Sequence, residues 1–178
     1  MINAWKLIKE ETAFKNKFVD IRKRTYALPN KKEAEYFIRD GMGNVASIFA
    51  ITKDNKIILA REFRPGPGMI LDELPGGVID PNETPLQAAE RELFEETGYK
   101  GELILLSESW LSAYSTGKKY SYLALNCQKH SEKQNMDHEN EFIEVVLKEK
   151  SEFEEQMKKG DLTDLETALL ATQYLKAH

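Results

Sequence analysis

Three glutamates within a short stretch of the chain could together hold a metal ion. Glu92, Glu95 and Glu96 stand at positions i, i+3 and i+4, a spacing that places three carboxylates on one helix face, about 5–6 Å apart. Like charges at this spacing repel one another and need to be neutralised. Hard divalent cations such as Mg²⁺ prefer carboxylate oxygens and keep water or phosphate oxygens as their remaining ligands. The alternative interpretation is a solvated acidic face on a helix rich in glutamate.

Capping residues indicate that these glutamates lie on a helix. Thr84 is a suitable N-cap, and Pro85 suits the first helical position, where its missing N–H costs nothing. Gly98 suits the left-handed residue that follows the end of a helix. We therefore expect a helix over 85–97. Its apolar stripe consists of Leu86, Ala89 and Leu93.

The segments before this helix are rich in glycine and proline. The sequence Pro75-Gly76-Gly77 lets the backbone come close to whatever lies beyond it, because glycine carries no side chain. Further upstream, the Pro and Gly residues of 65–68 force a loop directly after Arg64. Arg64 is therefore either a phosphate contact or an exposed arginine on a loop.

Apolar and alternating runs, separated by turn residues, predict a protein of mixed α and β elements. The expected strands are a pair within 4–28, a hairpin over 18–39 with its tip at Pro29-Asn30, a hairpin of 45–51 and 57–63, and the segments 71–74, 102–111, 120–127 and 141–147. The expected helices are 151–159, with Ser151 as its cap, and 164–176, with a stripe of Leu165, Ala168, Leu169, Thr172 and Leu175. Such elements form a sheet covered by helices on both sides.

Composition limits the class of protein. The chain has 178 residues, 41% of them apolar, which suits one globular domain with a real core, and its net charge is −5. That charge argues against a nucleic-acid binder, and phosphates would have to be held by a cation or by local Arg and Lys. No apolar run has the length of a signal peptide or a membrane span, so we expect a cytoplasmic protein without a membrane partner. The single cysteine, Cys127, excludes an intrachain disulfide and a cluster of thiolate ligands, and we expect it to be buried.

The stretch 77–99 matches a known pattern at every fixed position. The pattern is Gly-x5-Glu-x7-Arg-Glu-U-x-Glu-Glu-x-Gly-U, in which U is a bulky apolar residue, here Leu93 and Tyr99. A chance match at this composition is on the order of one in a hundred million per starting position. The stretch therefore resembles the Nudix box. The resemblance implies an α/β/α sandwich with a mixed sheet, of the α/β (α+β) class, and metal-dependent hydrolysis of a nucleoside diphosphate linked to another moiety, with Mg²⁺ or Mn²⁺ as cofactor.

The same resemblance implies roles for individual residues. The implied metal ligands are the carboxylates of Glu92, Glu95 and Glu96, with Glu96 central, and the carbonyl of Gly76. Glu95 and Glu96 are also candidate catalytic residues. Arg91 is the other catalytic candidate of the box, and it is implied to orient Glu83.

Segments outside the box resemble the ADP-ribose pyrophosphatase branch of this family. The resemblance rests on Glu62-Phe63-Arg64 and on 71–77, within which Arg64 and Glu73 are the candidate substrate-binding residues. It implies a nucleotide sugar as small-molecule substrate, with a nucleoside monophosphate and a sugar phosphate as products. One departure concerns the loop after the box, where Ala113 and Tyr114 stand in place of a proline that is usual in the branch.

Residues 129–140 are so polar that we expect a loop. Similar pyrophosphatases have an acidic loop at this place that supplies the general base or an extra metal ligand. Glu139 and Glu141 are the matching catalytic candidates, and solvated charge is the alternative for both.

Residues 1–40 resemble the N-terminal strands through which related pyrophosphatases form homodimers, ahead of a Nudix hydrolase domain over 41–178. The basic run 22–24 either faces an anionic substrate or protects an edge strand with solvated charge, and the second interpretation is favoured. Two other functional classes are alternatives. A Nudix-fold binding or regulatory module tends to lose the carboxylates that are intact here. A house-cleaning nucleoside triphosphate pyrophosphohydrolase would not need the N-terminal strands.

Overall fold

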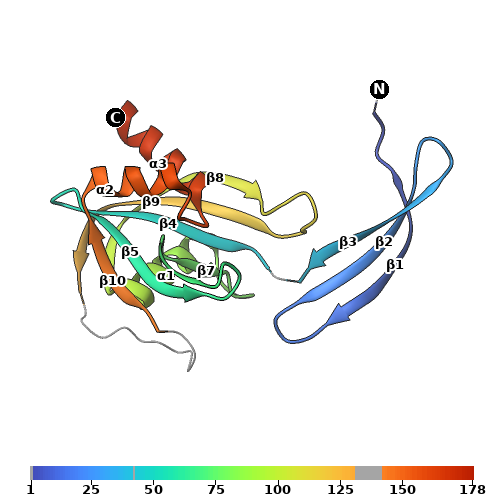
Figure 1. Cartoon of the computed structure of the whole chain (residues 1–178), viewed down its shortest axis with the longest axis horizontal. Helices are drawn as coiled ribbons and strands as arrows, with labels where there is room; N and C mark the ends of the chain where they lie inside the picture. Colours follow the sequence, from blue (N-terminus) through green and yellow to red (C-terminus); the bar gives the residue numbers. More distant parts are fainter. Residues whose placement is uncertain (1, 42, 131–141) are drawn as a thin grey trace. The chain divides into compact units, whose positions relative to one another are not determined.

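The computed structural model describes residues 2–41, 43–130 and 142–178, so the candidates Glu139 and Glu141 lie outside the described residues. The chain forms two compact units (Figure 1). The smaller unit consists of Met1–Asn44 and Ser109–Lys118, and the larger unit of Val45–Glu108 and Lys119–His178. Each unit has a sheet of its own.

The larger unit contains a seven-stranded mixed sheet of order β10-β5-β4-β9-β8, with β6 paired to β5 and β7 paired to β4. The pair of β4 and β9 is parallel, while β4 pairs with β5 and β7, and β5 with β6 and β10, in antiparallel fashion. The strands are β4 (Val45–Thr52), β5 (Ile57–Arg64), β6 (Met69–Glu73), β7 (Gly76–Val78), β8 (Tyr99–Trp110), β9 (Lys118–Lys129) and β10 (Glu144–Lys148). The helices are α1 (Pro85–Thr97), α2 (Lys150–Lys159) and α3 (Leu165–Ala177).

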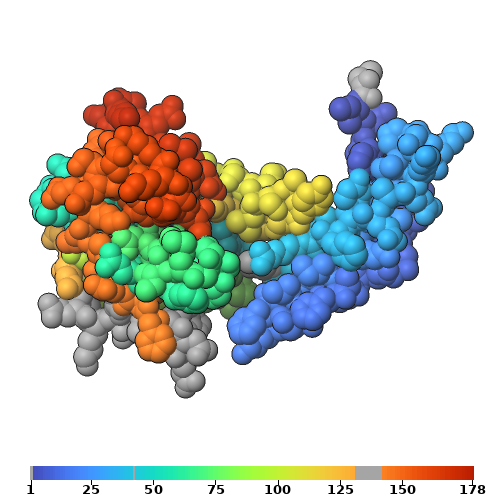
Figure 2. All heavy atoms as spheres, in the orientation of Figure 1, coloured from blue at the N-terminus to red at the C-terminus, as the bar shows by residue number. Residues whose placement is uncertain are grey.

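Alternation along β4 divides the core into two layers. Ile48 and Ala50 belong to the cluster that includes the buried side chains of α1, whereas Phe49 and Ile51 belong to the cluster under α2 and α3. On the second side, Phe49 meets Phe153 of α2 edge to face, with ring centroids 5.5 Å apart. Figure 2 shows the atoms of α2 and α3, orange to red, gathered on the outside of the larger unit. The expected α/β/α sandwich with a mixed sheet is therefore confirmed.

Helix α1 has the bounds expected from its caps. The Thr84 side chain accepts a hydrogen bond from the Gln87 N–H, and the Gln87 side chain accepts one from the Thr84 N–H, so the two form a capping box. Gly98 ends the helix in the left-handed conformation, with φ of 73°. The expected stripe is wrong in one member, because Leu86 in the first turn is 44% exposed. The helix meets the sheet through alanines instead, and Ala88 takes a buried place that was not expected.

Other expectations need small corrections. Helix α2 begins at Lys150 with Glu149 as its N-cap, so Ser151 lies inside the first turn and is not the cap. Leu169, expected on the buried stripe of α3, is 54% exposed. Cys127 is buried, as expected. No helix in the described part of the chain is both long and apolar enough to cross a membrane.

The smaller unit holds a three-stranded antiparallel sheet of order β1-β2-β3, as the sequence predicted for an N-terminal strand element. Its strands are β1 (Lys6–Lys15), β2 (Asp20–Ala27) and β3 (Glu33–Asp40). The basic run 22–24 lies on β2, which is the central strand, so the expected edge strand is wrong. These side chains form ion pairs with carboxylates of all three strands: Arg22 with Asp20 and Asp40, Lys23 with Glu11 and Glu35, and Arg24 with Glu10.

Candidate active site

The carboxylate of Glu96 lies where helix α1 meets strand β7. Its Oε2 accepts a hydrogen bond from the Gly76 N–H at 3.0 Å, so the helix and the glycine segment are joined at this point. Burial raises the pKa of Glu96 well above its usual value, and the negative charges of Glu92 and Glu62 raise it further, against the hydrogen bond from Gly76 and the charge of Arg64. The site therefore has an excess of carboxylates that a cation would offset.

Gly77 leaves the space that the Glu92 carboxylate occupies. A Cβ atom on Gly77 would lie 2.3 Å from Glu92 Oε1 and 2.7 Å from its Cδ, closer than real side chains approach. Gly76 is equally confined, because a Cβ there would lie 2.3 Å from the carbonyl oxygen of Ala46. The two glycines thus allow β7 to lie between β4 and the acidic face of α1.

Arg91 connects the other glutamates of the box. Its Nε and one terminal nitrogen donate to Glu83 at 2.7 and 3.0 Å, so the expected pair of Arg91 and Glu83 is present. The second terminal nitrogen donates to Glu92 Oε1 at 2.9 Å and to Glu95 Oε2 at 3.0 Å. The hydrogen bonds from Arg91 lower the pKa of Glu83 below its usual value. One guanidinium therefore fixes three carboxylates relative to one another.

Strand β5 contributes a carboxylate that the sequence interpretation missed. Glu62 is mostly buried, forms an ion pair with Arg64 at 2.9 Å, and acts through its charge on the pKa of Glu96. Glu62 and Arg64 are two residues apart on one strand, so their side chains share a face of the sheet. This i, i+2 spacing on a predicted strand is the sequence signal from which the position of Glu62 beside Arg64 could have been predicted. Arg64 is thus brought to the site, and Glu62 comes with it.

Glu73, predicted to bind substrate, has a different environment. Its side chain is fully buried, and its oxygens accept hydrogen bonds from the backbone N–H of Thr163, at 3.2 and 3.3 Å, and from the Thr163 hydroxyl. A terminal nitrogen of Arg64 lies 4.0 Å away. This placement ties β6 to the turn before α3 and gives no support to direct contact between Glu73 and a substrate.

The donors at this site are those that a hard divalent cation prefers. Glu62, Glu92 and Glu96 supply carboxylate oxygens and no softer ligand; burial first, and then the charges of Glu92 and Glu62, raise the pKa of Glu96. Arg91 meanwhile takes the place of a cation for Glu92 and Glu95. Within residues 2–41, 43–130 and 142–178, no three acidic, histidine or cysteine side chains are gathered as closely as a metal centre requires. The donor types thus suit a hard divalent cation, whereas the Glu92, Glu95 and Glu96 carboxylates do not lie as close together as a bound ion requires, and Glu95 is hydrogen-bonded to Arg91.

A family model described as the NUDIX domain matches residues 42–165 of the chain. The chain belongs to the Nudix family. Two relatives of this Nudix protein align with it over 177 residues at 30% identity, covering 96% of this chain and 92% of each relative. One is the methanol dehydrogenase activator of Bacillus methanolicus, and the other is the ADP-ribose pyrophosphatase of Bacillus subtilis (strain 168).

Among solved structures, the crystal structure of an ADP compounds hydrolase superposes on this Nudix protein with a TM-score of 0.84 at 21% identity. The match covers 99% of this chain and 97% of that chain, which shows that the two share a fold. Together with the family model and the pyrophosphatase relative, it identifies the chain as a Nudix hydrolase. Hydrolases of this family generally need divalent cations.

Proposed function

We propose that this Nudix hydrolase cleaves the pyrophosphate bond of ADP-ribose or another nucleotide sugar and releases a nucleoside monophosphate and a sugar phosphate. The observation that carries the proposal is the convergence of Glu92 and Glu96 on the Gly76–Gly77 segment, with Glu62 and Arg64 beside them. An acidic site next to an arginine suits a substrate whose phosphates arrive with a cation. The name of one relative, the ADP-ribose pyrophosphatase of Bacillus subtilis, points to the same substrate class.

Mg²⁺ is the proposed cofactor, and Mn²⁺ is the substitute that similar oxygen donors accept. The proposed ligands are the carboxylates of Glu92, Glu95 and Glu96 and the carbonyl of Gly76. A bound divalent cation would neutralise the charge of the diphosphate and make water a stronger nucleophile. Arg91 donates to the carboxylates of both Glu92 and Glu95 and so holds them together on one face of α1. The Gly76 N–H orients the Glu96 carboxylate.

Arg64 is the proposed contact to the substrate phosphates. Its side chain is one-third exposed, and Glu62 holds one terminal nitrogen at 2.9 Å. Its Nε is buried, and no hydrogen-bond acceptor for it is found among the residues that the structure describes. The guanidinium therefore has N–H groups that Glu62 does not use. Such groups suit a phosphate, which accepts two parallel hydrogen bonds from arginine.

Two further proposals come from the resemblance to pyrophosphatases. Glu139 and Glu141 are proposed as the general base or an added metal ligand. Residues 1–40 are proposed to form a homodimer, and the exposure of large apolar side chains on this sheet supports that proposal, because such side chains are usually covered in an assembly. The most exposed of them include Leu7, Ile8, Phe14 and Phe37.

A substrate panel tests the proposed function. The purified protein is incubated with ADP-ribose, GDP-mannose, UDP-sugars, dinucleoside polyphosphates and dNTPs, each with Mg²⁺ and with EDTA. The expected result is turnover of a nucleotide sugar in Mg²⁺ and none in EDTA. Preference for dNTPs would favour a house-cleaning enzyme, and failure to turn over any compound would favour a binding module.

A further inference from the structure

Strand β6 ends in two buried carboxylates that point to different partners. Glu73 is bound by Thr163, and Asp72, whose side chain is 12% exposed, is bound by Arg61 of β5 and Lys148 of β10. Burying carboxylates is costly unless each finds charged or hydrogen-bonding partners. β6 has five residues and pairs only with β5 in the described sheet. Beyond its pairing with β5, these side chains link β6 to β10 and to the turn before α3.

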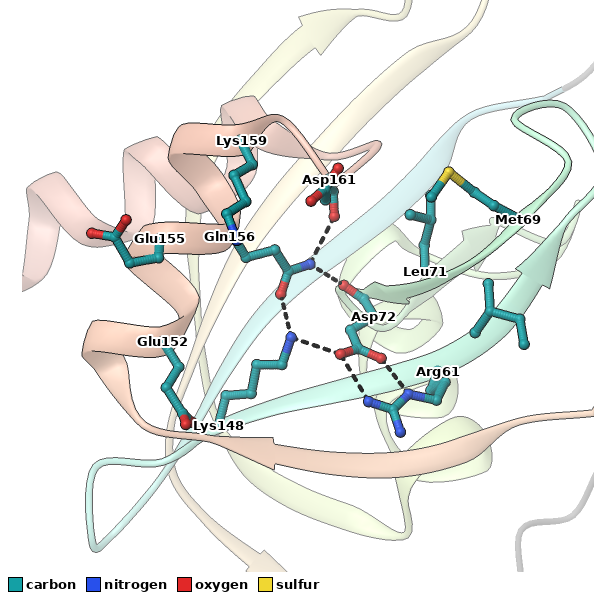
Figure 3. A pocket seen from close by; sticks show the side chains of 11 residues that line it. Arg61, Met69, Leu71, Asp72, Lys148, Glu152, Glu155, Gln156, Lys159 and Asp161 are labelled. Atoms are coloured by element: carbon teal, nitrogen blue, oxygen red, sulfur yellow. Dashed lines mark hydrogen bonds and ion pairs between the residues drawn. The ribbon is translucent and has the colours of Figure 1, made fainter.

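The contacts of Asp72 form a network along a pocket of about 340 Å³ between β6 and α2 (Figure 3). Arg61 donates to both carboxylate oxygens of Asp72, at 2.6 and 3.1 Å. The Lys148 ammonium lies 2.6 Å from Asp72 Oδ2 and donates to Gln156 Oε1 at 2.7 Å. The amide nitrogen of Gln156 donates to the Asp72 carbonyl at 2.6 Å and to the Asp161 carbonyl at 2.8 Å.

Lys148 is central to this network. It is the last residue of β10. Its ammonium contacts the carboxylate of Asp72 and also the side chain of Gln156, which donates to the Asp72 carbonyl. Lys148 thus contacts the side chain of Asp72 directly and its main chain through Gln156, alongside the two hydrogen bonds from Arg61 (Figure 3). Without the ammonium, Gln156 and Asp72 would each lose a charge-assisted hydrogen bond.

The network is joined to the active site by a short, buried connection. Only three residues separate Asp72 from Gly76, and among them Leu74 lies in the core and Pro75 is fully buried. The Pro75 carbonyl accepts a hydrogen bond from the Ile48 N–H at 2.8 Å, and the next residue donates to Glu96. A close-packed connection of this kind transmits a displacement instead of absorbing it.

We propose that Lys148 is a positioning residue that holds β6 in the place from which Gly76 donates to Glu96. The inference rests on the proposed function, because it assigns Lys148 an effect on the metal-binding carboxylates. A purely structural ion pair would lower the stability of the fold and leave the folded protein's metal affinity unchanged. A positioning residue changes the metal affinity of protein that is fully folded.

The test compares Lys148→Met with Lys158→Met, an identical change at an exposed lysine that pairs with Glu155 on α2. Mn²⁺ alone is titrated against each variant and the signal of free Mn²⁺ is followed by EPR, at a temperature where circular dichroism shows the native fold. Loss of a residue that supports a metal ligand commonly costs about 10–100-fold in affinity or activity. We expect about tenfold weaker Mn²⁺ binding in Lys148→Met, wild-type binding in Lys158→Met, and recovery in Lys148→Arg.

Kinetics supply a second measurement. On the nucleotide sugar that the panel selects, Lys148→Met should lower kcat by about the same factor with KM nearly unchanged. If Lys148→Met does not fold, Gln156→Leu replaces it as the test. This change removes the hydrogen bond to the Asp72 carbonyl, keeps a similar side-chain volume, and should cause the same loss of Mn²⁺ affinity. Equal Mn²⁺ affinity in wild type and in a folded variant would overturn the role of Lys148 alone. Absence of Mn²⁺ binding in the wild type would overturn the proposed metal site, and this inference with it.

Discussion

A methyl group on Gly77 would collide with the carboxylate of Glu92, to which the three nearest heavy atoms all belong. The added Cβ would lie 2.3 Å from Oε1, 2.7 Å from Cδ and 3.0 Å from Oε2. Carbon and oxygen atoms in ordinary contact stay about 3.5 Å apart, so the carboxylate must retreat by about 1 Å. Because it is the end of a flexible side chain, that retreat should cost the fold only about 1 kcal/mol.

The same retreat should be severe for a metal ligand. Distances between a metal ion and its ligands vary by only about 0.2 Å in well-formed sites, several times less than the displacement expected here. We therefore expect Gly77→Ala to weaken Mn²⁺ binding by about 10–100-fold, with a comparable loss of kcat. A hundredfold loss corresponds to about 2.7 kcal/mol of binding free energy.

Two other glycines provide matched controls for this substitution. A Cβ on Gly76 would meet backbone, with the Ala46 carbonyl oxygen at 2.3 Å and Ser47 Cα at 3.0 Å, so Gly76→Ala should destabilise the fold by about 1–3 kcal/mol. A Cβ on Gly66 would meet nothing within 4 Å, so Gly66→Ala should change neither property. Thermal unfolding without metal and Mn²⁺ titration by EPR measure the two properties separately.

A Gly77→Ala variant that binds Mn²⁺ as tightly as the wild type would show that Glu92 is not a metal ligand. A loss of stability as large as that of Gly76→Ala would also contradict it, because it would show that the Glu92 side chain cannot move aside.

Two further predictions follow from the charged contacts. Arg91→Lys keeps the charge but cannot reproduce the contacts to Glu83, Glu92 and Glu95, so kcat/KM should fall by about 10–100-fold in steady-state assays, and wild-type kinetics would contradict the role of the guanidinium. The second prediction concerns Asp72. Burial raises its pKa, but the hydrogen bonds from Arg61 and Lys148 lower it by more, so the pKa in the folded protein is below its usual value. This stabilisation is complete above the unfolded-state pKa of about 3.9 and is lost as the pH falls through the lower folded pKa. The difference in urea midpoint between wild type and Asp72→Asn should therefore shrink as the pH falls from 6 to 3, and a constant difference would contradict the assignment.

Local signals predicted the elements of this protein well. Helix α1 has its predicted bounds because Thr84, Pro85 and Gly98 act on the backbone within one or two turns. The pair of Arg91 and Glu83 was also predictable, since both belong to the box. The hairpins of the smaller unit followed from alternation and turn residues.

Partners distant in the sequence could not be predicted in this way. Glu73 can be buried because Thr163, 90 residues further along the chain, donates hydrogen bonds to its carboxylate. The local sequence around either residue gives no sign of this contact. Glu62 comes close to Glu96 only because β5 and β7 both pair with β4 in the sheet. Leu86 fits the helical period and is nevertheless exposed, whereas the small residues Ala88 and Ala89 are fully buried against the sheet.

The most direct test of the account compares Glu96→Gln with Glu90→Gln, two identical changes on α1 of which only the first lies at the proposed metal site. Hydrolysis of ADP-ribose to AMP and ribose 5-phosphate is measured in Mg²⁺, with circular dichroism to verify the fold. The account predicts that Glu96→Gln loses about 100-fold or more in kcat while Glu90→Gln retains wild-type turnover. Full Mg²⁺-dependent activity in a folded Glu96→Gln variant would contradict it.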